Sequence, residues 1–74
     1  MKVAIIGQGY VGLSLAMRAS GFHEVIGYDL DESKIRNLKL GVSYIEGIEN
    51  DEIAQKLNSR NYFPTSDESD IVTR

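Results

Sequence analysis

Three closely spaced glycines near the start of the chain are the residues best suited to hold a ligand. They occur in Gly7-Gln8-Gly9-Tyr10-Val11-Gly12, which has the spacing G-x-G-x-x-G. An acidic residue, Asp29, follows Gly7 at close to the ~20-residue interval that separates such a turn from a ribose-binding carboxylate. The pattern predicts a site for a dinucleotide, with the pyrophosphate at the glycines and a ribose at the acid.

Each residue of the glycine turn has a physical role in this interpretation. Gly7 permits a tight turn out of a strand, and Gly9 has no Cβ, so a pyrophosphate can approach its main chain. Gly12 lets the following helix lie close to the sheet. The main-chain N–H groups of Tyr10, Val11 and Gly12 are expected to point at the phosphate, assisted by the helix dipole.

Asp29 indicates which dinucleotide is preferred. Its carboxylate would accept hydrogen bonds from the adenosine ribose and would repel a 2′-phosphate, so the predicted cofactor is NAD rather than NADP. Lys34 and Arg36 are close enough in sequence to weaken this preference. The alternative is that the glycines serve only the turn and the packing. A Walker-type phosphate loop is excluded, because Leu13 stands where that motif requires lysine.

The elements that must position these residues follow from the hydrophobic pattern. The apolar run over residues 2–6 is typical of a strand buried on both faces, as in a parallel sheet. Residues 10–20 predict a helix that is covered on most sides, with Val11, Leu15 and Ala19 as one of its apolar stripes. Gly21 is expected to end this helix in the left-handed conformation. Residues 24–28 predict the second strand.

A second helix is predicted over residues 32–40. Asp31 is its expected N-cap, and Gly41 is expected to end it. Residues 42–48 are typical of an irregular connection, so this part of the chain is predicted to join two helices rather than a helix and a strand.

A third helix is predicted to begin at Asn50-Asp51-Glu52. A third strand is predicted at residues 61–63, and it must be short or lie at an edge of the sheet, because Pro64 has no N–H to donate to a neighbouring strand. Residues 65–74 show little periodicity. Strands that alternate with helices indicate an α/β fold, here a Rossmann-like βαβ arrangement on a parallel sheet. The fold is expected to be truncated, with about three strands and three helices.

Length and composition restrict the classes of protein that remain. A chain of 74 residues is one small domain or part of a larger one, and it has no cysteine for a disulfide, a thiolate zinc site or a nucleophile. The net charge is −3, with no basic patch, so nucleic acid is not an expected partner. Asp67, Glu68 and Asp70 do not have the spacing of an EF-hand loop, so no metal ion is expected. The chain has no apolar run of membrane-spanning length, so we predict no membrane association and a cytoplasmic location.

The phrase G-x-G-Y-V-G-L within residues 2–18 resembles the opening of the UDP-glucose/GDP-mannose dehydrogenase family. The resemblance continues through residues 27–31, 41–46 and 61–67, so it covers nearly the whole chain. The phrase Ser43-Tyr44-Ile45-Glu46 is most similar to the branch that acts on UDP-N-acetylhexosamines, with UDP-glucose as the alternative.

This resemblance implies an enzyme that oxidises the C6 hydroxyl of a nucleotide sugar to a carboxylate with two NAD and a covalent thioester. Carried over by position, the family's NAD contacts are Gly7, Gly9, Tyr10, Val11, Gly12, Asp29 and Lys34. Lys34 would help to hold the adenosine ribose, the alternative being an ordinary solvated lysine on a helix.

The family's catalytic cysteine and lysine and its nucleotide-sugar domain lie beyond residue 74. We therefore expect residues 1–74 to be the N-terminal portion of a Rossmann NAD-binding domain, without catalytic residues of its own. A nucleotide sugar would bind the other domains of the parent protein, which we expect to be a homo-oligomer. In the strand order 3-2-1-4, the first strand becomes an exposed edge, so we expect the isolated chain to be marginally stable, to dimerise or to aggregate.

Two other functions stay open. A nucleotide-sensing Rossmann regulatory module shares the strand, the glycine turn and the late acid, but it usually lacks the extra helix within residues 42–60. A prephenate-type dehydrogenase suits residues 21–29, but it does not suit Tyr10-Val11-Gly12-Leu13 or residues 43–46.

Overall fold

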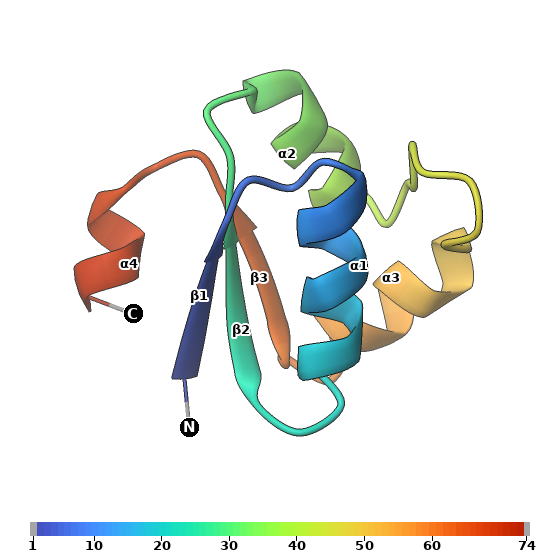
Figure 1. Ribbon diagram of the computed structural model, residues 1–74, viewed down its shortest axis with the longest axis horizontal. Coiled ribbons are helices and arrows are strands. Elements are labelled where there is room, and N and C mark those ends of the chain that lie inside the picture. Colours follow the sequence, from blue (N-terminus) through green and yellow to red (C-terminus); the bar gives the residue numbers. More distant parts are fainter. Residues whose placement is uncertain (1, 74) are drawn as a thin grey trace.

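The computed structural model describes residues 2–73, which form one parallel sheet with helices on both of its faces (Figure 1). The elements in chain order are β1 (Lys2–Ile6), α1 (Tyr10–Ala19), β2 (Glu24–Tyr28), α2 (Glu32–Lys39), α3 (Asn50–Asn58), β3 (Tyr62–Thr65) and α4 (Ser69–Thr73). The predicted α/β fold with a Rossmann-like βαβ arrangement is confirmed.

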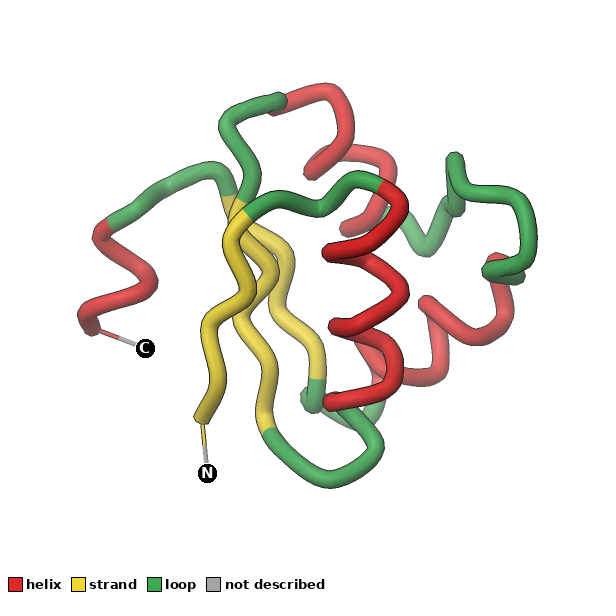
Figure 2. The backbone as a smooth tube through the Cα atoms, viewed as in Figure 1, coloured by secondary structure: helices red, strands yellow, loops and turns green. Residues whose placement is uncertain are grey.

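The three strands lie in the order β1-β2-β3, and both neighbouring pairs are parallel. Val25 of β2 pairs with Val3 on one side and with Tyr62 on the other. Figure 2 shows that the loops after all three strands leave at the same end of the sheet. Because ligands of open α/β sheets bind outside the carboxyl ends of the strands, this end is where a site is expected.

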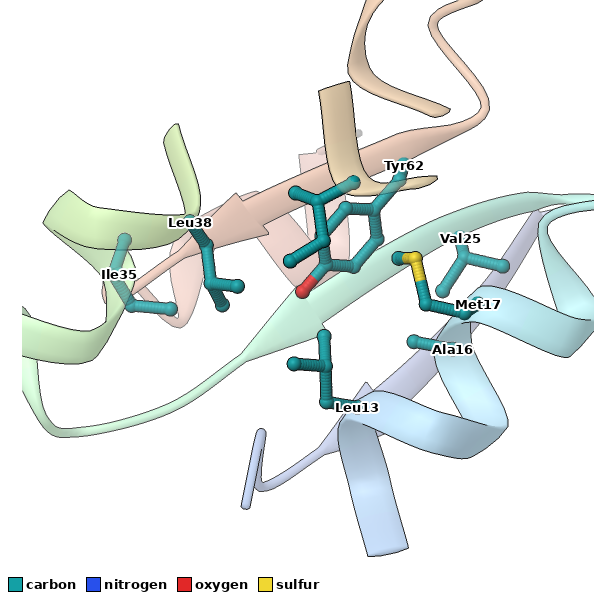
Figure 3. Close-up of a cluster of buried hydrophobic side chains, with 8 residues drawn as sticks. Leu13, Ala16, Met17, Val25, Ile35, Leu38 and Tyr62 are labelled. Atoms are coloured by element: carbon teal, nitrogen blue, oxygen red, sulfur yellow. The ribbon is translucent and has the colours of Figure 1, made fainter. Parts of the chain in front are cut away.

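The core lies between the sheet and helices α1, α2 and α3, while α4 lies on the other side of the sheet (Figure 1). The core consists of buried apolar side chains and one tyrosine ring, and Figure 3 shows this cluster: Leu13, Ala16, Met17, Val25, Ile35, Leu38, Ile53 and Tyr62. The spacing of Leu13, Ala16 and Met17 is that of one helix face, and this face docks α1 on the sheet.

Two predictions about exposure are wrong within the described residues. Helix α1 is not covered on most sides, because Val11 and Leu15 are 75% and 53% exposed on the face turned away from the sheet. Strand β1 is not buried on both faces, because exposed residues alternate along it with half-buried ones, and Ile6 is 65% exposed. Among the described strands, β1 pairs only with β2. The predicted position of β1 at an exposed edge is confirmed.

The end of α1 also differs from the prediction. The C-cap is Ser20 in the right-handed conformation, and Gly21 has no positive φ. The helix is closed instead by short-range bonds, in which Gly21 N donates to Arg18 O and Phe22 N to Ala19 O. By contrast, Gly41 after α2 has φ +76°, as expected of a glycine that ends a helix.

Helix α4 is an element that the sequence did not predict. Its five residues are too few to show a helical period. The helix starts from a network of short side chains, in which Thr65 Oγ1 accepts from Asp67 N and donates to Asp70 Oδ2. Asp67 Oδ1 accepts from both N and Oγ of Ser69, and these bonds lower the pKa of Asp67.

Asp31 is the N-cap of α2, as predicted, and its carboxylate accepts from the N–H groups of Ser33 and Lys34. Replacing Asp31 by alanine should lower the free energy of unfolding by about 1 kcal/mol, because two N–H groups lose their acceptor. Urea unfolding followed by circular dichroism measures this change. Asp31→Asn, which keeps a capping oxygen, should unfold within about 0.5 kcal/mol of the unchanged chain, and an equal loss in both variants would contradict the capping role.

Candidate dinucleotide-binding site

The glycine turn joins β1 to α1 at the carboxyl end of the sheet. Gly7 has φ +89°, a conformation that residues with a side chain rarely adopt. Its N–H donates to Tyr28 O at 2.6 Å, which extends the β1–β2 ladder by one bond before the chain turns. The predicted role of Gly7 in the tight turn is therefore seen in its backbone.

Gly12 and Gly9 differ sharply in the space around them. A Cβ on Gly12 would lie 1.7 Å from Gly7 O, so only glycine allows the first turn of α1 to pack on the chain leaving β1. A Cβ on Gly9 would meet nothing within 4 Å. Gly12 is thus required by packing within the protein, whereas the absence of a side chain at Gly9 leaves open space in front of the helix.

The amino end of α1 faces this open space without a capping side chain. Gly9 is the N-cap and makes no side-chain cap hydrogen bond, and Leu13 N donates to Gly9 O at 2.9 Å. The N–H groups of Tyr10, Val11 and Gly12 therefore have no intrahelical acceptor. Together with the positive end of the helix dipole, they can bind an anion.

Asp29 lies directly after β2, beside the glycine turn. Its Oδ2 accepts from Gln8 N at 2.7 Å, and its Oδ1 accepts from Asp31 N at 2.9 Å. Burial acts to raise the pKa of Asp29, but these two bonds and the nearby charge of Lys34 outweigh it and lower the pKa. Each carboxylate oxygen has a further lone pair, so Asp29 can still accept from two hydroxyl groups.

Lys34 and Tyr44 flank the carboxylate. The Nζ of Lys34 lies 5.8 Å from the centroid of the Tyr44 ring, and the Tyr44 hydroxyl donates to Gln8 O at 2.5 Å. Burial, with the charges of Asp29 and Asp31, raises the pKa of Tyr44 to about 12, so its hydroxyl is a donor at neutral pH. The connection over residues 42–48 is thereby bound to the glycine turn.

A cavity of about 170 Å³ lies at the carboxyl ends of β1 and β2, lined by Ile6, Gly7, Tyr28, Asp29 and Leu30. Sites for small ligands commonly measure about 300–1,000 Å³, so this cavity can hold only part of a dinucleotide. A larger cavity of about 480 Å³ lies over residues 43–51 and does not include the glycine turn. The hydrogen bond from Gln8 N and the charge of Lys34 both reach Asp29, so the structure brings together the glycine turn, Asp29 and Lys34, all of which the sequence singled out.

Residue 8 is the functional position that sequence reasoning missed. The motif leaves this position open, yet Gln8 is fully buried, and it bonds Asp29, Tyr44 and Tyr62. A polar side chain in an otherwise apolar stretch was the available signal. The sequence singled out Tyr44 only as part of the phrase Ser43-Tyr44-Ile45-Glu46, and its contact with Gln8 depends on a fold that the spacing alone did not reveal.

The family model described as "UDP-glucose/GDP-mannose dehydrogenase family, NAD binding domain" matches residues 1–73. The chain belongs to the UDP-glucose/GDP-mannose dehydrogenase family. The domain that this model describes binds NAD, in agreement with the predicted cofactor. The resemblance inferred from the glycine phrase and the later segments is therefore confirmed.

Individual members of the UDP-glucose/GDP-mannose dehydrogenase family agree with this assignment. UDP-glucose 6-dehydrogenase TuaD of Bacillus subtilis is 40% identical over 79 residues, covering 96% of this chain and 17% of the relative. UDP-N-acetyl-D-glucosamine 6-dehydrogenase of Salmonella typhi is 48% identical over 42 residues, covering 57% of this chain and 10% of the relative. The solved UDP-D-ManNAc dehydrogenase of Pyrococcus horikoshii superposes with a TM-score of 0.85 at 30% identity, covering 96% of this chain and 18% of that one.

The chain therefore spans less than a fifth of the length of these family members. Across residues 2–73, no helix has the length and apolar character needed to cross a membrane. The same residues contain no group of three or more histidine, aspartate or glutamate side chains placed to hold a metal ion.

Proposed function

We propose that residues 1–74 form the N-terminal portion of the NAD-binding domain of an NAD-dependent nucleotide-sugar 6-dehydrogenase, and that they hold the adenosine and pyrophosphate half of NAD. One observation carries this proposal. Gly12 is closed by packing, whereas Gly9 opens on empty space in front of uncapped N–H groups, with Asp29 at the neighbouring strand end. An ordinary packed turn needs Gly12, but it does not need the space at Gly9.

The residues of this site fit the chemistry of NAD. The N–H groups of Tyr10, Val11 and Gly12 would donate to the pyrophosphate, and Gly7 and Gly9 would let it approach the main chain. This placement also follows the positions of the NAD contacts in the family.

The adenosine ribose would lie against Asp29. The carboxylate keeps two free lone-pair positions for the ribose hydroxyls, and its negative charge disfavours the 2′-phosphate of NADP. Lys34, held beside this carboxylate and over the Tyr44 ring, would border the ribose. When bound, NAD supplies the acceptor for hydride, and residues 1–74 bind and orient it.

For the parent protein we propose oxidation of the C6 hydroxyl of a UDP-sugar to a carboxylate. This is a four-electron oxidation in which two NAD accept two hydrides, one water molecule supplies the second carboxylate oxygen, and three protons are released. The names of relatives support a UDP-sugar and include both UDP-N-acetylhexosamine and UDP-glucose enzymes. The phrase Ser43-Tyr44-Ile45-Glu46 favours a UDP-N-acetylhexosamine.

The test is NAD reduction by the native polypeptide that carries this chain, purified at its full length. UDP-N-acetylglucosamine, UDP-N-acetylmannosamine, UDP-glucose and prephenate are supplied in turn, and NADH is followed by absorbance. We expect two NADH per molecule of one UDP-sugar and none with prephenate. Reduction with prephenate alone would contradict the proposal, and tight NAD binding without reduction by any substrate would favour a nucleotide-sensing module.

A further inference from the structure

Gln8 is a fully buried amide at the centre of the candidate site. Its Nε2 donates to Gly7 O at 2.8 Å and to Ile5 O at 3.3 Å, and its Oε1 accepts from the Tyr62 hydroxyl at 2.5 Å. The side chain therefore donates to one carbonyl within β1 and to one in the turn that follows it. Because the amide presents its donor to carbonyls and its acceptor to a hydroxyl, only one orientation of the amide fits.

The main chain of Gln8 makes two further long-range bonds. Its N–H donates to Asp29 Oδ2, and its carbonyl accepts from the Tyr44 hydroxyl. One residue thus joins the glycine turn to the acid after β2, to the connection over residues 42–48 and, through Tyr62, to β3. These partners are 21, 36 and 54 positions away in the sequence.

The side chains of Gln8 and Tyr62 meet beside Gly27, which has no side chain of its own. A Cβ on Gly27, in the middle of β2, would lie 2.4 Å from Gln8 Oε1 and 2.7 Å from Tyr62 Cε1. A glycine inside a strand has no turn to serve, and it marks a close approach of other groups. Gly27 therefore makes the space in which the glutamine amide meets the tyrosine hydroxyl.

Tyr62 is suited to holding the amide in place. Its ring lies among the aliphatic side chains of the core (Figure 3). Burial, with the nearby Tyr44 and Asp29, raises the pKa of Tyr62, so its hydroxyl stays protonated and remains a donor. The Tyr62 hydroxyl is thus a fixed donor on a rigid strand.

We propose that Gln8, fixed by Tyr62, is the positioning residue that holds the glycine turn and Asp29 in their ligand-binding geometry. The proposal rests on the proposed function, because it concerns how that site is preorganised for NAD. A turn that is already held in one conformation does not have to be ordered when the ligand binds, so the entropic cost of ordering it does not weaken the affinity. A buried glutamine that served folding alone would affect stability without changing the affinity of the folded chain.

The deciding variant is Tyr62→Phe, which keeps the ring and leaves Gln8 Oε1 without its donor. The matched control is Ser20→Ala, which removes another buried hydroxyl, the one that donates to Met17 O at 2.8 Å at the far end of α1. Both variants lose one buried hydrogen bond, so both should be less stable. A second test variant, Gln8→Met, removes the amide but keeps the length of the side chain.

Two measurements are made on each folded variant, which is prepared in the native full-length polypeptide that carries this chain. The first is the Kd for NAD by calorimetry, which we expect to rise about tenfold in Tyr62→Phe and to stay within about twofold in Ser20→Ala. The second is residue-resolved amide hydrogen exchange without ligand, which we expect to accelerate selectively at Gln8 and Asp31 in Tyr62→Phe. If Gln8→Met does not fold, Tyr62→Phe alone carries the test.

An unchanged Kd for Tyr62→Phe, with exchange accelerated evenly over the chain, would overturn the positioning role. If the unchanged chain binds no NAD, the proposed function fails, and the exchange measurement still decides the positioning role. Selective exchange at the turn then supports it, and even acceleration overturns it. The two failures are therefore distinguishable.

Discussion

Replacing Gly12 by alanine should unfold the chain and abolish NAD binding with it. The new Cβ would lie 1.7 Å from Gly7 O and 2.8 Å from Gly7 C, distances that real Cβ atoms essentially never show. Both contacts are to main chain, so no side chain can move aside. We expect a loss of more than about 4 kcal/mol, which reaches the lower end of the total stability of about 4–11 kcal/mol that a domain of this size can have. Thermal unfolding by circular dichroism measures it.

Gly9→Ala is the matched control, because the same methyl group is added three residues earlier into open space. Gly9 has φ −75°, which alanine adopts without strain, so the chain should fold with a loss of about 1 kcal/mol or less. Its Kd for NAD should nevertheless rise at least about tenfold, because the methyl group occupies the space proposed for the pyrophosphate. A folded Gly12→Ala variant, or a Gly9→Ala variant with undiminished affinity, would contradict the assigned roles.

Asp29→Asn should weaken NAD binding by about ten- to a hundredfold. A hydrogen bond to a charged group contributes about 1.5–3 kcal/mol, and the amide offers its NH₂ where a carboxylate oxygen accepts from Gln8 or Asp31. The ratio of the Kd for NADP to the Kd for NAD should fall, because the charge that repels a 2′-phosphate is gone. Calorimetry with both dinucleotides measures these effects.

Asp31→Asn is the control for Asp29→Asn. It removes a neighbouring charge and keeps an oxygen to cap α2, so the Kd for NAD should change less than about threefold. Acid unfolding adds a second readout. The pKa of Asp29 is lowered in the folded chain, so its contribution to stability is present above its unfolded pKa of about 3.9 and is lost as pH falls through the folded value. In Asp29→Asn, the free energy of unfolding should therefore fall less steeply as the pH is lowered below about 4. Equal affinities of Asp29→Asn and Asp31→Asn for NAD would contradict the ribose role of Asp29.

The fold and the main parts of the site could be predicted from local sequence signals. The glycine spacing, the acid after the second strand and the capping Asp31 are all features of neighbouring residues, and the parallel order follows from strands that alternate with helices. Pro64 correctly indicated an edge strand, although β3 begins at Tyr62 and continues through Pro64 to Thr65. Pro64 fits there because β3 pairs on one side only among the described residues.

The rest could not be predicted, because it depends on contacts between distant residues. Nothing near Gln8 in the sequence indicates that Tyr62 will donate to its amide, or that Gly27 is needed to make space for the pair. The exposure of Val11 depends on which elements cover α1, which periodicity within one helix does not reveal. Helix α4 was missed because it begins from side-chain bonds such as that between Thr65 and Asp70 rather than from an apolar stripe.

The most direct test of the proposed site is the amide NMR spectrum of the isotope-labelled chain during a titration with NAD. We predict saturable shifts at Gly9, Tyr10, Val11 and Gly12, with a second group of shifts around Asp29. We predict no saturable shifts in the cavity over residues 43–51, apart from Tyr44, whose hydroxyl contacts the turn. Shifts confined to residues 43–51, or no saturable shift at the glycine turn, would contradict the assignment of this turn as the pyrophosphate site.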